Sequence, residues 1–460
     1  MAMPAIRTEL LPKSKGALRV LHTADWHFGK MLGDLSRQEE HTRFLSWLLD
    51  VLVKEKVDVL LIAGDIFDTA NPPQAAERMY FEFLASVYRA TKCCVVITGG
   101  NHDSPAHLEA PGRVLRTLNV HVVGALPDDI GDLIVPVPTN KDPQLLIAAV
   151  PFLRDRDLRT GAFGQTADDI REELREGIEA VYQRAADACS DSGVAMLAAG
   201  HLTVAGARVS DSERDVHVGG LGKVDHKIFP EVFDYVALGH LHRPQSMGTE
   251  AIRYSGSPIP LSFSECEDEK EVRLLDFEGG ELTGNQSLPI PFTRRLMQVK
   301  TSRLELESVL SQLTVEKGAL PTWVEITVET QNSSENLFEL ARSLTEDRLD
   351  DFEIVRVQAR RHREATALSE KDSAGFEDVD TLLDSPREVF ERRLAVSGEM
   401  SDEDMKQMRV AFDELYGLYL EERKGEEPEP EEQPLDESTV PLAAEADQEL
   451  LFDFGREDEP

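Results

Sequence analysis

The stretch at residues 57–68, VDVLLIAGDIFD, constrains the fold of this chain more than any other. Its apolar run Val59–Ala63 is too short to cross a membrane as a helix, and it shows no alternation of apolar and polar residues. Such a run, ending at a glycine, is typical of a strand that is buried on both faces of a sheet. Asp65 then stands at the carboxyl end of the strand, where ligands bind in open α/β sheets.

The same arrangement recurs four more times, because apolar runs at residues 18–24, 93–98, 194–199 and 235–238 also lead into polar side chains. One occurrence alone would be weak, since a glycine followed by His or Asp is often only a turn. Five occurrences are difficult to explain by turn chemistry. We predict that five strands bring a common set of side chains together: Asp25, His27, Asp65, Asn101, His102, Asp103, His201, His240 and His242.

Segments with apolar residues at helical spacing separate many of these runs. We expect helices over residues 36–54, 75–88, 106–118 and 166–189, and further strands over residues 120–123, 145–149 and 272–277. The alternation of strand and helix predicts βαβ units and an α/β fold. Residues 204–227 contain few apolar runs and are expected to form a long functional or mobile loop.

A second unit is expected to begin near Thr293. Residues 296–301, 323–330 and 352–359 have the composition of strands, and helical patterns at residues 304–313 and 333–344 lie between them. The order βαβαβ predicts a small α/β cap domain. We find no catalytic constellation in it.

The C-terminal part of the chain has a different composition. After a polar linker, two amphipathic helices are expected within residues 385–423, and they need a surface on which to bury their apolar stripes. That surface is either the cap or the helices of a partner protein. From Gly425 onward the chain has fourteen acidic residues and one basic residue, Arg456, which predicts a disordered acidic tail.

Composition limits the class of protein. With 460 residues the chain is long enough for two or three domains. Its four cysteines form no CxxC pair, and we find no secretory signal or transmembrane stretch, so we expect a cytoplasmic protein. The net charge of −37 argues against autonomous nucleic-acid binding through bulk electrostatics.

The residue types at the strand ends indicate metal chemistry. Asp, Asn and His are the ligands that hard or borderline divalent ions such as manganese prefer. A site for two ions needs one carboxylate that touches both, and Asp65, central in the motif order, is our candidate. Two such ions can hold a phosphate, activate a water and neutralise charge in an in-line displacement.

The motifs Asp25-x-His27, Gly64-Asp65, Gly100-Asn101-His102-Asp103, Gly200-His201 and Gly239-His240-x-His242 resemble the five motifs of the calcineurin-like metallophosphoesterases. The sequence around these motifs, including GDIFDTANPP and YSGSPIPLSFSE, is similar to the sequences of the nuclease subunits of double-strand-break repair complexes. The resemblance covers roughly residues 18–360. It implies an α/β sandwich of two β-sheets flanked by helices, with a small α/β cap domain and C-terminal helices.

The resemblance also implies roles for individual residues. One ion would be held by Asp25, His27, Asp65 and His242, and the second by Asp65, Asn101, His201 and His240. His102 would face the scissile phosphate and stabilise or protonate the leaving oxygen. Asp68 is expected to orient His102, although some relatives carry His at that position. Asp103 is expected to support the turn.

The same resemblance implies partners and a division of the chain. The partners would be DNA, an ATPase with long coiled coils, and a second copy of this subunit. The reaction would combine 3′→5′ exonuclease and endonuclease cleavage. We expect these parts: an N-terminal extension at 1–16, a nuclease domain at 17–285, a cap at 286–363, a linker at 364–384, ATPase-binding helices at 385–423 and the tail at 424–460.

Three alternatives remain open at this point. A phosphatase or cyclic-nucleotide phosphodiesterase could use the same metal site, although it would not need the cap or the terminal helices. A non-catalytic adaptor for the ATPase would be indicated by a missing ligand, and none is missing. In the tail, residues 448–452 resemble peptides that dock on bacterial sliding clamps, because they contain Gln448, Leu451 and Phe452 at the expected spacing. Glu449 stands where an apolar residue is usual in these peptides. A chance match is therefore the alternative.

Overall fold

The structure is a computed structural model. It describes residues 10–139, 142–158, 166–189, 193–210, 213, 223–316, 318–330, 336–360, 406, 408, 409 and 412. Met1–His362 form one compact unit and Arg363–Pro460 a second one. Among the described residues, no helix is long and apolar enough to cross a membrane.

The first sheet contains three of the predicted ligand-bearing strands. Its six strands are ordered β14-β13-β1-β4-β5-β6. The four strands β1 (Leu18–Thr23), β4 (Val59–Ala63), β5 (Cys94–Thr98) and β6 (Val120–Val123) are parallel to one another. The antiparallel hairpin of β13 (Glu271–Glu278) and β14 (Glu281–Pro289) extends the sheet beside β1.

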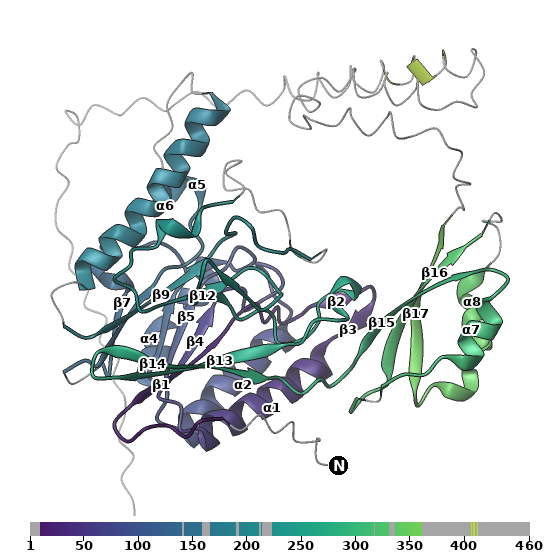
Figure 1. Cartoon of the computed structure of the whole chain (residues 1–460), viewed down its shortest axis with the longest axis horizontal. Coiled ribbons are helices and arrows are strands. Elements are labelled where there is room, and N and C mark those ends of the chain that lie inside the picture. The colour runs from purple at the N-terminus through teal and green to yellow at the C-terminus, as the bar shows by residue number, and fades with distance from the viewer. Residues whose placement is uncertain are drawn as a thin grey trace, which may run out of the picture. The chain divides into compact units, whose positions relative to one another are not determined.

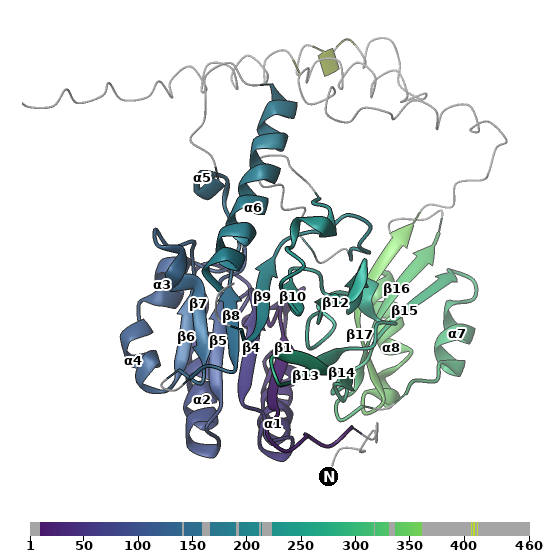
Figure 2. The ribbon, with the colours of Figure 1, turned by 60° about the vertical axis from the view of Figure 1, so that its left-hand side comes forward.

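The second sheet contains the other two ligand-bearing strands and has the order β11-β12-β10-β9-β8-β7. Its central strands, β8 (Leu145–Ala149), β9 (Ala195–His201), β10 (Tyr235–Gly239) and β12 (Thr249–Tyr254), are parallel. The edge strands β7 (Ile134–Val137) and β11 (Gln245–Met247) are antiparallel to their neighbours. Figures 1 and 2 show the two sheets facing each other.

The strands of the first sheet have apolar residues on both faces because both faces are covered. Val59 and Leu61 of β4 point into the core between the sheets, together with the apolar residues of β8, β9 and β10. Leu60 and Ile62 point the other way, into a core formed with α1 (Gln38–Lys54) and α2 (Gln74–Ala90). This explains the missing alternation in the sequence, and the predicted α/β fold with two sheets is confirmed.

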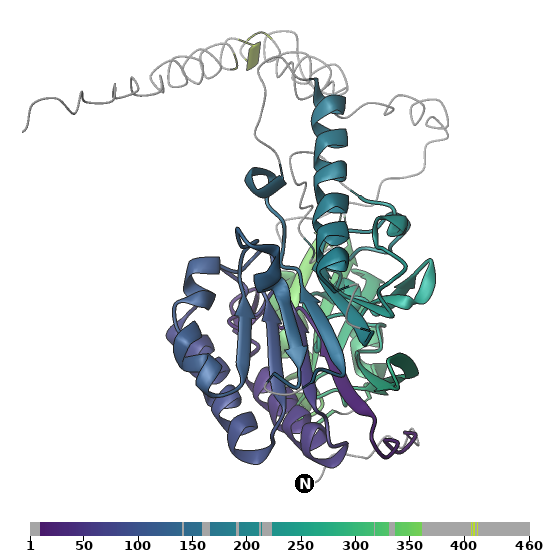
Figure 3. The same ribbon diagram turned by 90° about the vertical axis from the view of Figure 1, so that its left-hand side faces the viewer.

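Other helices lie around the sheets. The C-terminal half of α6 (Ala167–Cys189) packs against the second sheet, while its N-terminal half extends beyond that sheet (Figure 3). One prediction was wrong: residues 106–118 do not form a single helix. They form α3 (Pro105–Glu109) and α4 (Gly112–Thr117), because Pro111 has no N–H with which to continue the first helix.

The predicted cap is a three-stranded parallel sheet, β15 (Leu296–Ser302), β16 (Thr322–Glu329) and β17 (Phe352–Arg360), with α7 (Leu306–Gln312) and α8 (Leu337–Ser343) on one face (Figure 1). The strand β14 continues to Pro289, four residues past the boundary that we predicted at residue 285. Residues 290–295 therefore connect the β13–β14 hairpin to the three-stranded sheet.

The cap contacts the core through one aromatic residue and several charged groups. Trp323 packs with Phe263 and Leu296, and the guanidinium of Arg294 lies 4.1 Å from the centre of its ring. Arg294 also donates a hydrogen bond to Glu40 of α1 at 3.0 Å. These contacts join the first strand and the second strand of the cap to the core.

The predicted linker at 364–384 and tail at 424–460, including residues 448–452, lie outside the described residues. Of the predicted helices at 385–423, only Lys406, Met408, Arg409 and Phe412 are described, and they are helical.

Candidate metal centre

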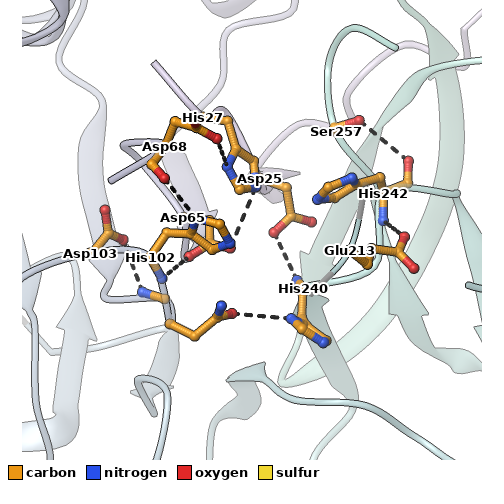
Figure 4. Close-up of polar contacts among 12 residues, drawn as sticks. Asp25, His27, Asp65, Asp68, His102, Asp103, Glu213, His240, His242 and Ser257 are labelled. Atoms are coloured by element: carbon orange, nitrogen blue, oxygen red, sulfur yellow. Dashed lines mark hydrogen bonds and ion pairs between the residues drawn. The ribbon is translucent and has the colours of Figure 1, made fainter. Parts of the chain in front are cut away.

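The predicted site residues lie together where strands of the two sheets end (Figure 4). Asp25 and His27 follow β1, Asp65 follows β4, and Asn101 and His102 follow β5. His201 is the last residue of β9, and His240 and His242 follow β10. The parallel strands of each sheet end at the same edge, which is why polar residues far apart in the sequence converge here.

Four of these residues have an unusual backbone. The φ angles of Asp25, His27, Asp65 and His240 are 53°, 47°, 49° and 96°, in the left-handed region that non-glycine residues seldom adopt. The loops hold one another in this conformation, since the Asp25 N–H donates to the Gly64 carbonyl and the His27 N–H to the Asp65 carbonyl. Such strain clusters at functional sites because the surrounding contacts fix the side chains there.

Two motif glycines permit the close approach of the loops. A Cβ atom on Gly100 would lie 2.1 Å from Asp65 Oδ1, and one on Gly239 would lie 1.8 Å from the Ala63 carbonyl oxygen. Any side chain at either position would push the two sheets or the two loops apart. The glycines in the motifs are therefore required by the geometry of the site.

One group of potential metal-ligand atoms comes from Asp65, Asn101, His201 and His240. His201 donates from Nδ1 to the Ala63 carbonyl at 3.0 Å, which turns its Nε2 toward Asn101 Oδ1 at 2.9 Å and Asp65 Oδ2 at 3.3 Å. His240 Nδ1 lies 3.1 Å from the same Asn101 oxygen. Ligands in adjacent positions of an octahedral cation are about 3 Å apart, so this spacing fits a bound divalent ion.

A second group lies beside it. Asp25 Oδ2 and His27 Nε2 are buried and have no hydrogen-bond partner among the described residues. The rings of His27 and His242 have centroids 5.0 Å apart, so the His242 ring lies next to His27. Buried polar atoms usually have a hydrogen-bond partner, so two such atoms at the strand ends fit the binding of a cation there.

Asp65 stands between the two groups. Its Oδ2 atom lies 3.5 Å from His27 Nε2 and 3.3 Å from His201 Nε2. Two sets of potential ligand atoms, each within 4.8 Å of one another, share this residue: Asp25, Asp65 and His201, and His27, Asp65 and His102. This is the position that a carboxylate bridging two ions must occupy.

The buried carboxylates of the site favour the binding of cations. Burial raises the pKa of Asp25 to about 7, and the charge of Asp65 adds to this against the opposing charge of His201. Burial lowers the pKa of His201, but the charge of Asp65 and a hydrogen bond to it raise that pKa to about 9. The buried carboxylates of the site therefore require positive charge beside them. A pair of divalent ions would supply that charge.

His102 lies beside the second group and is held by the main chain. Its Nδ1 donates to the carbonyl oxygen of Asp68 at 2.7 Å, and its N–H donates to Asp65 Oδ1 at 2.9 Å. The prediction that Asp68 orients His102 thus applies to the carbonyl of Asp68. The Asp68 carboxylate instead contacts His27 Nδ1 at 3.2 Å and Lys30 at 3.0 Å, which directs His27 Nε2 toward Asp65.

Asp103 fastens two of the loops together, as its predicted supporting role requires. Its carboxylate accepts hydrogen bonds from the N–H groups of Ile66, Phe67 and Gly100 at 2.9–3.1 Å.

Asp103→Ala should lower the free energy of unfolding by about 2 kcal/mol or more, because three buried donors lose their acceptor. Urea unfolding of the variant measures this, with the exposed Asp132→Ala as control; a loss below about 0.5 kcal/mol would contradict the role.

Sequence reasoning missed several residues that hold His242. Glu213 accepts the His242 N–H at 2.6 Å, and Lys270 donates to the His242 carbonyl at 2.8 Å (Glu213 is drawn in Figure 4). Glu265 Oε1 lies 3.5 Å from His242 Nδ1. The only sequence signal was that Glu265 directly follows the Ser/Pro/Gly-rich segment at residues 253–264.

The two facing sheets and the polar cluster at their strand ends define a metallophosphoesterase. Residues 18–244 match the family model of the calcineurin-like phosphoesterases, and residues 293–397 match the model of the type 5 capsule protein repressor C-terminal domain.

The chain is 36% identical to SbcD, a subunit of the nuclease SbcCD, from Escherichia coli K12 over 401 residues, which cover 86% of this chain and 97% of that protein. It is 41% identical to SbcD of Rhodobacter capsulatus over 285 residues, 60% of this chain and 70% of that one. It is 33% identical to SbcD of Bacillus subtilis over 332 residues, 71% of this chain and 83% of that one. The chain belongs to the SbcD family of nuclease subunits.

Proposed function

We propose that this chain is the manganese-dependent nuclease subunit of an SbcCD-type complex, and that it hydrolyses DNA phosphodiesters as a 3′→5′ exonuclease on duplex ends and an endonuclease on hairpin or blocked ends. The main supporting observation is that Asp65 belongs to two sets of buried potential ligand atoms, one with Asp25 and His201 and the other with His27 and His102. Its Oδ2 atom lies 3.5 Å from His27 Nε2 and 3.3 Å from His201 Nε2. Membership of the SbcD family favours DNA as the substrate.

The ligand sets that we propose are those that the family resemblance implies. Asp25, His27, Asp65 and His242 hold one ion, and Asp65, Asn101, His201 and His240 hold the other. A bound pair of divalent ions supplies charge neutralisation at the phosphate and a nucleophilic water at neutral pH. The chain holds the ligands rigidly, since His27 and His201 each have Nδ1 fixed by an oxygen atom outside the ion site.

His102 supplies a proton in this proposal. Its Nδ1 is fixed on the Asp68 carbonyl, so the proton that can be transferred is the one on Nε2. The imidazolium form of His102 would donate that proton to the leaving oxygen of the DNA strand. Because the main chain holds His102 next to His27 and Asp65, its ring stays close to the ligands of the ions.

We further propose an SbcC-type coiled-coil ATPase as the partner, with two copies of each subunit in a heterotetramer. The helices at residues 385–423 are the segment that we propose to bind the ATPase. The net charge of −37 supports this assignment, because an acidic nuclease needs its partner for much of the affinity for DNA. We expect the complex to act in the cytoplasm on DNA ends during repair, recombination and replication.

A nuclease assay tests the proposed function. The purified chain is incubated with linear and hairpin duplex DNA and manganese, with and without an SbcC-type ATPase, and in parallel with p-nitrophenyl phosphate derivatives. We expect cleavage of both DNAs, enhanced by the ATPase and lost with a chelator. Hydrolysis of the p-nitrophenyl compounds without cleavage of duplex DNA would instead indicate a phosphatase, and activity on neither substrate would indicate an adaptor.

The tail carries the proposed clamp-binding segment, residues 448–452. We expect that removal of the last 13 residues lowers retention of the protein on an immobilised bacterial sliding clamp at least about tenfold, a loss of about 1.4 kcal/mol in binding free energy. The truncated chain should keep its nuclease activity, because no proposed site residue lies in the tail. Equal retention of the full and truncated chains would dispose of clamp binding through this segment.

A further inference from the structure

A buried carboxylate lies behind the proposed ligand His242. Glu265 ends the short 3-10 helix η3 (Phe263–Glu265), and its side chain is fully buried. Its Oε1 atom lies 3.5 Å from His242 Nδ1. Charged side chains are rarely buried completely unless they have a partner or a function, so the position of Glu265 requires an explanation.

Lys270 pairs with Glu265 and also binds the main chain of His242. Its ammonium group donates to Glu265 Oε2 at 2.6 Å, to Ser257 Oγ at 3.0 Å and to the His242 carbonyl oxygen at 2.8 Å. All three donors of the ammonium are therefore used. Glu265 and Lys270 together fix both the ring and the main chain of His242.

The surrounding segment keeps this pair in place. Glu265 Oε2 also accepts the Leu261 N–H at 3.2 Å, and its Oε1 accepts the Ser262 hydroxyl at 3.3 Å. Phe263, two residues before Glu265, packs against Leu296 and Trp323 of the cap. The carboxylate thus stands on a segment that is anchored against the cap.

We propose that Glu265 is a positioning residue for the metal centre: it accepts the proton on His242 Nδ1 and thereby directs His242 Nε2 at an ion. This inference rests on the proposed two-ion site and adds the group that keeps His242 in the correct tautomer. A histidine that binds metal through one nitrogen usually donates from the other to a carboxylate or a carbonyl. His27 and His201 follow the same rule with Asp68 and Ala63.

The substitution Glu265→Gln tests this arrangement, because Lys270 decides how the new amide is oriented. The ammonium needs an acceptor, so the amide oxygen must face Lys270 and the amide NH₂ must face His242 Nδ1. His242 would then be protonated on Nε2, the nitrogen that has to bind the ion. The variant therefore places the proton on the wrong nitrogen while it leaves the shape of the site almost unchanged.

The experiment uses the full-length chain with Glu267→Gln as a matched control, since Glu267 lies two residues away and is exposed. Titration calorimetry with manganese measures the affinity for each ion. We expect E265Q to bind one of two ions about 10- to 100-fold more weakly, with the other ion little changed and E267Q like the wild type. ¹⁵N spectra of histidine-labelled, metal-free protein should show that His242 changes from the Nδ1-H to the Nε2-H tautomer.

Unchanged affinity for both ions and an unchanged tautomer in folded E265Q would overturn the inference. If E265Q does not fold, Glu265→Asp replaces it: the charge beside Lys270 is kept, the reach to His242 is shortened, and the same weakening is expected. Two bound ions in a wild-type chain that does not cleave DNA would refute the proposed function and leave this inference intact. A wild-type chain that binds no pair of ions would overturn both.

Discussion

Asp65→Asn should abolish paired metal binding and slow DNA cleavage by about a thousandfold or more, since several kcal/mol of charge stabilisation depend on the ions. The amide keeps the size of the side chain, and its oxygen can still accept the His102 N–H that now binds Asp65 Oδ1 at 2.9 Å. The loss is therefore one of charge and bridging capacity rather than of folding. Metal analysis of the desalted variant and a nuclease assay with manganese measure the two effects.

The matched control is Asp34→Asn, an exposed aspartate in the turn between the short strands β2 (Met31–Leu32) and β3 (Leu35–Ser36). It changes the net charge by the same amount and should keep two ions and full activity. If Asp65→Asn also retained two ions per chain, Asp65 would not bridge them, and the ligand sets proposed above would have to be redrawn.

His102→Leu should keep both ions and the binding of the ATPase but lower the rate of cleavage by about 10²- to 10⁴-fold, the usual contribution of a positioned proton donor. The side chain is held by the Asp68 carbonyl and is assigned to neither ligand set, so its loss should affect the transfer of a proton rather than metal binding. Single-turnover kinetics and manganese titration of the same preparation separate the two effects.

The control for this variant is His107→Leu, which removes a histidine five residues further along the chain that pairs with Glu77 at 2.9 Å. Its cleavage rate should stay close to that of the wild type. A DNA substrate with sulfur in place of the leaving oxygen should restore the rate of His102→Leu, because a thiolate leaves without a proton. Full activity of His102→Leu on ordinary DNA would show that another group, or no group, donates the proton.

The fold and the cluster of site residues could be predicted because both depend on a local pattern. A strand such as Val59–Ala63 that is covered on both faces must be apolar throughout, and the Gly64-Asp65 pair at its end marks the edge of the sheet. Five such patterns are visible without knowledge of the pairing of strands. The break at Pro111 was visible too, and the prediction of one helix over residues 106–118 failed because it followed apolar periodicity alone.

The groups that hold the site together could not be predicted because they depend on tertiary contacts. We expected Asp68 to orient His102, and it does so with its carbonyl oxygen while its carboxylate contacts His27. Backbone geometry decides which of the two groups faces His102, and the sequence does not give that geometry. Glu213 and Glu265 reach His242 from positions 29 and 23 residues away in the sequence. Strands β12 and β14, which we did not predict, carry mixed polar and apolar residues and are recognisable only through their pairing.

The most direct test of the account is anomalous diffraction at the manganese absorption edge from crystals of the full chain grown with manganese. The proposed two-ion site predicts two peaks about 3.5–4 Å apart, with Asp65 between them, His27 and His242 beside one, and Asn101 and His201 beside the other. A single peak, or two peaks that do not share Asp65, would contradict it.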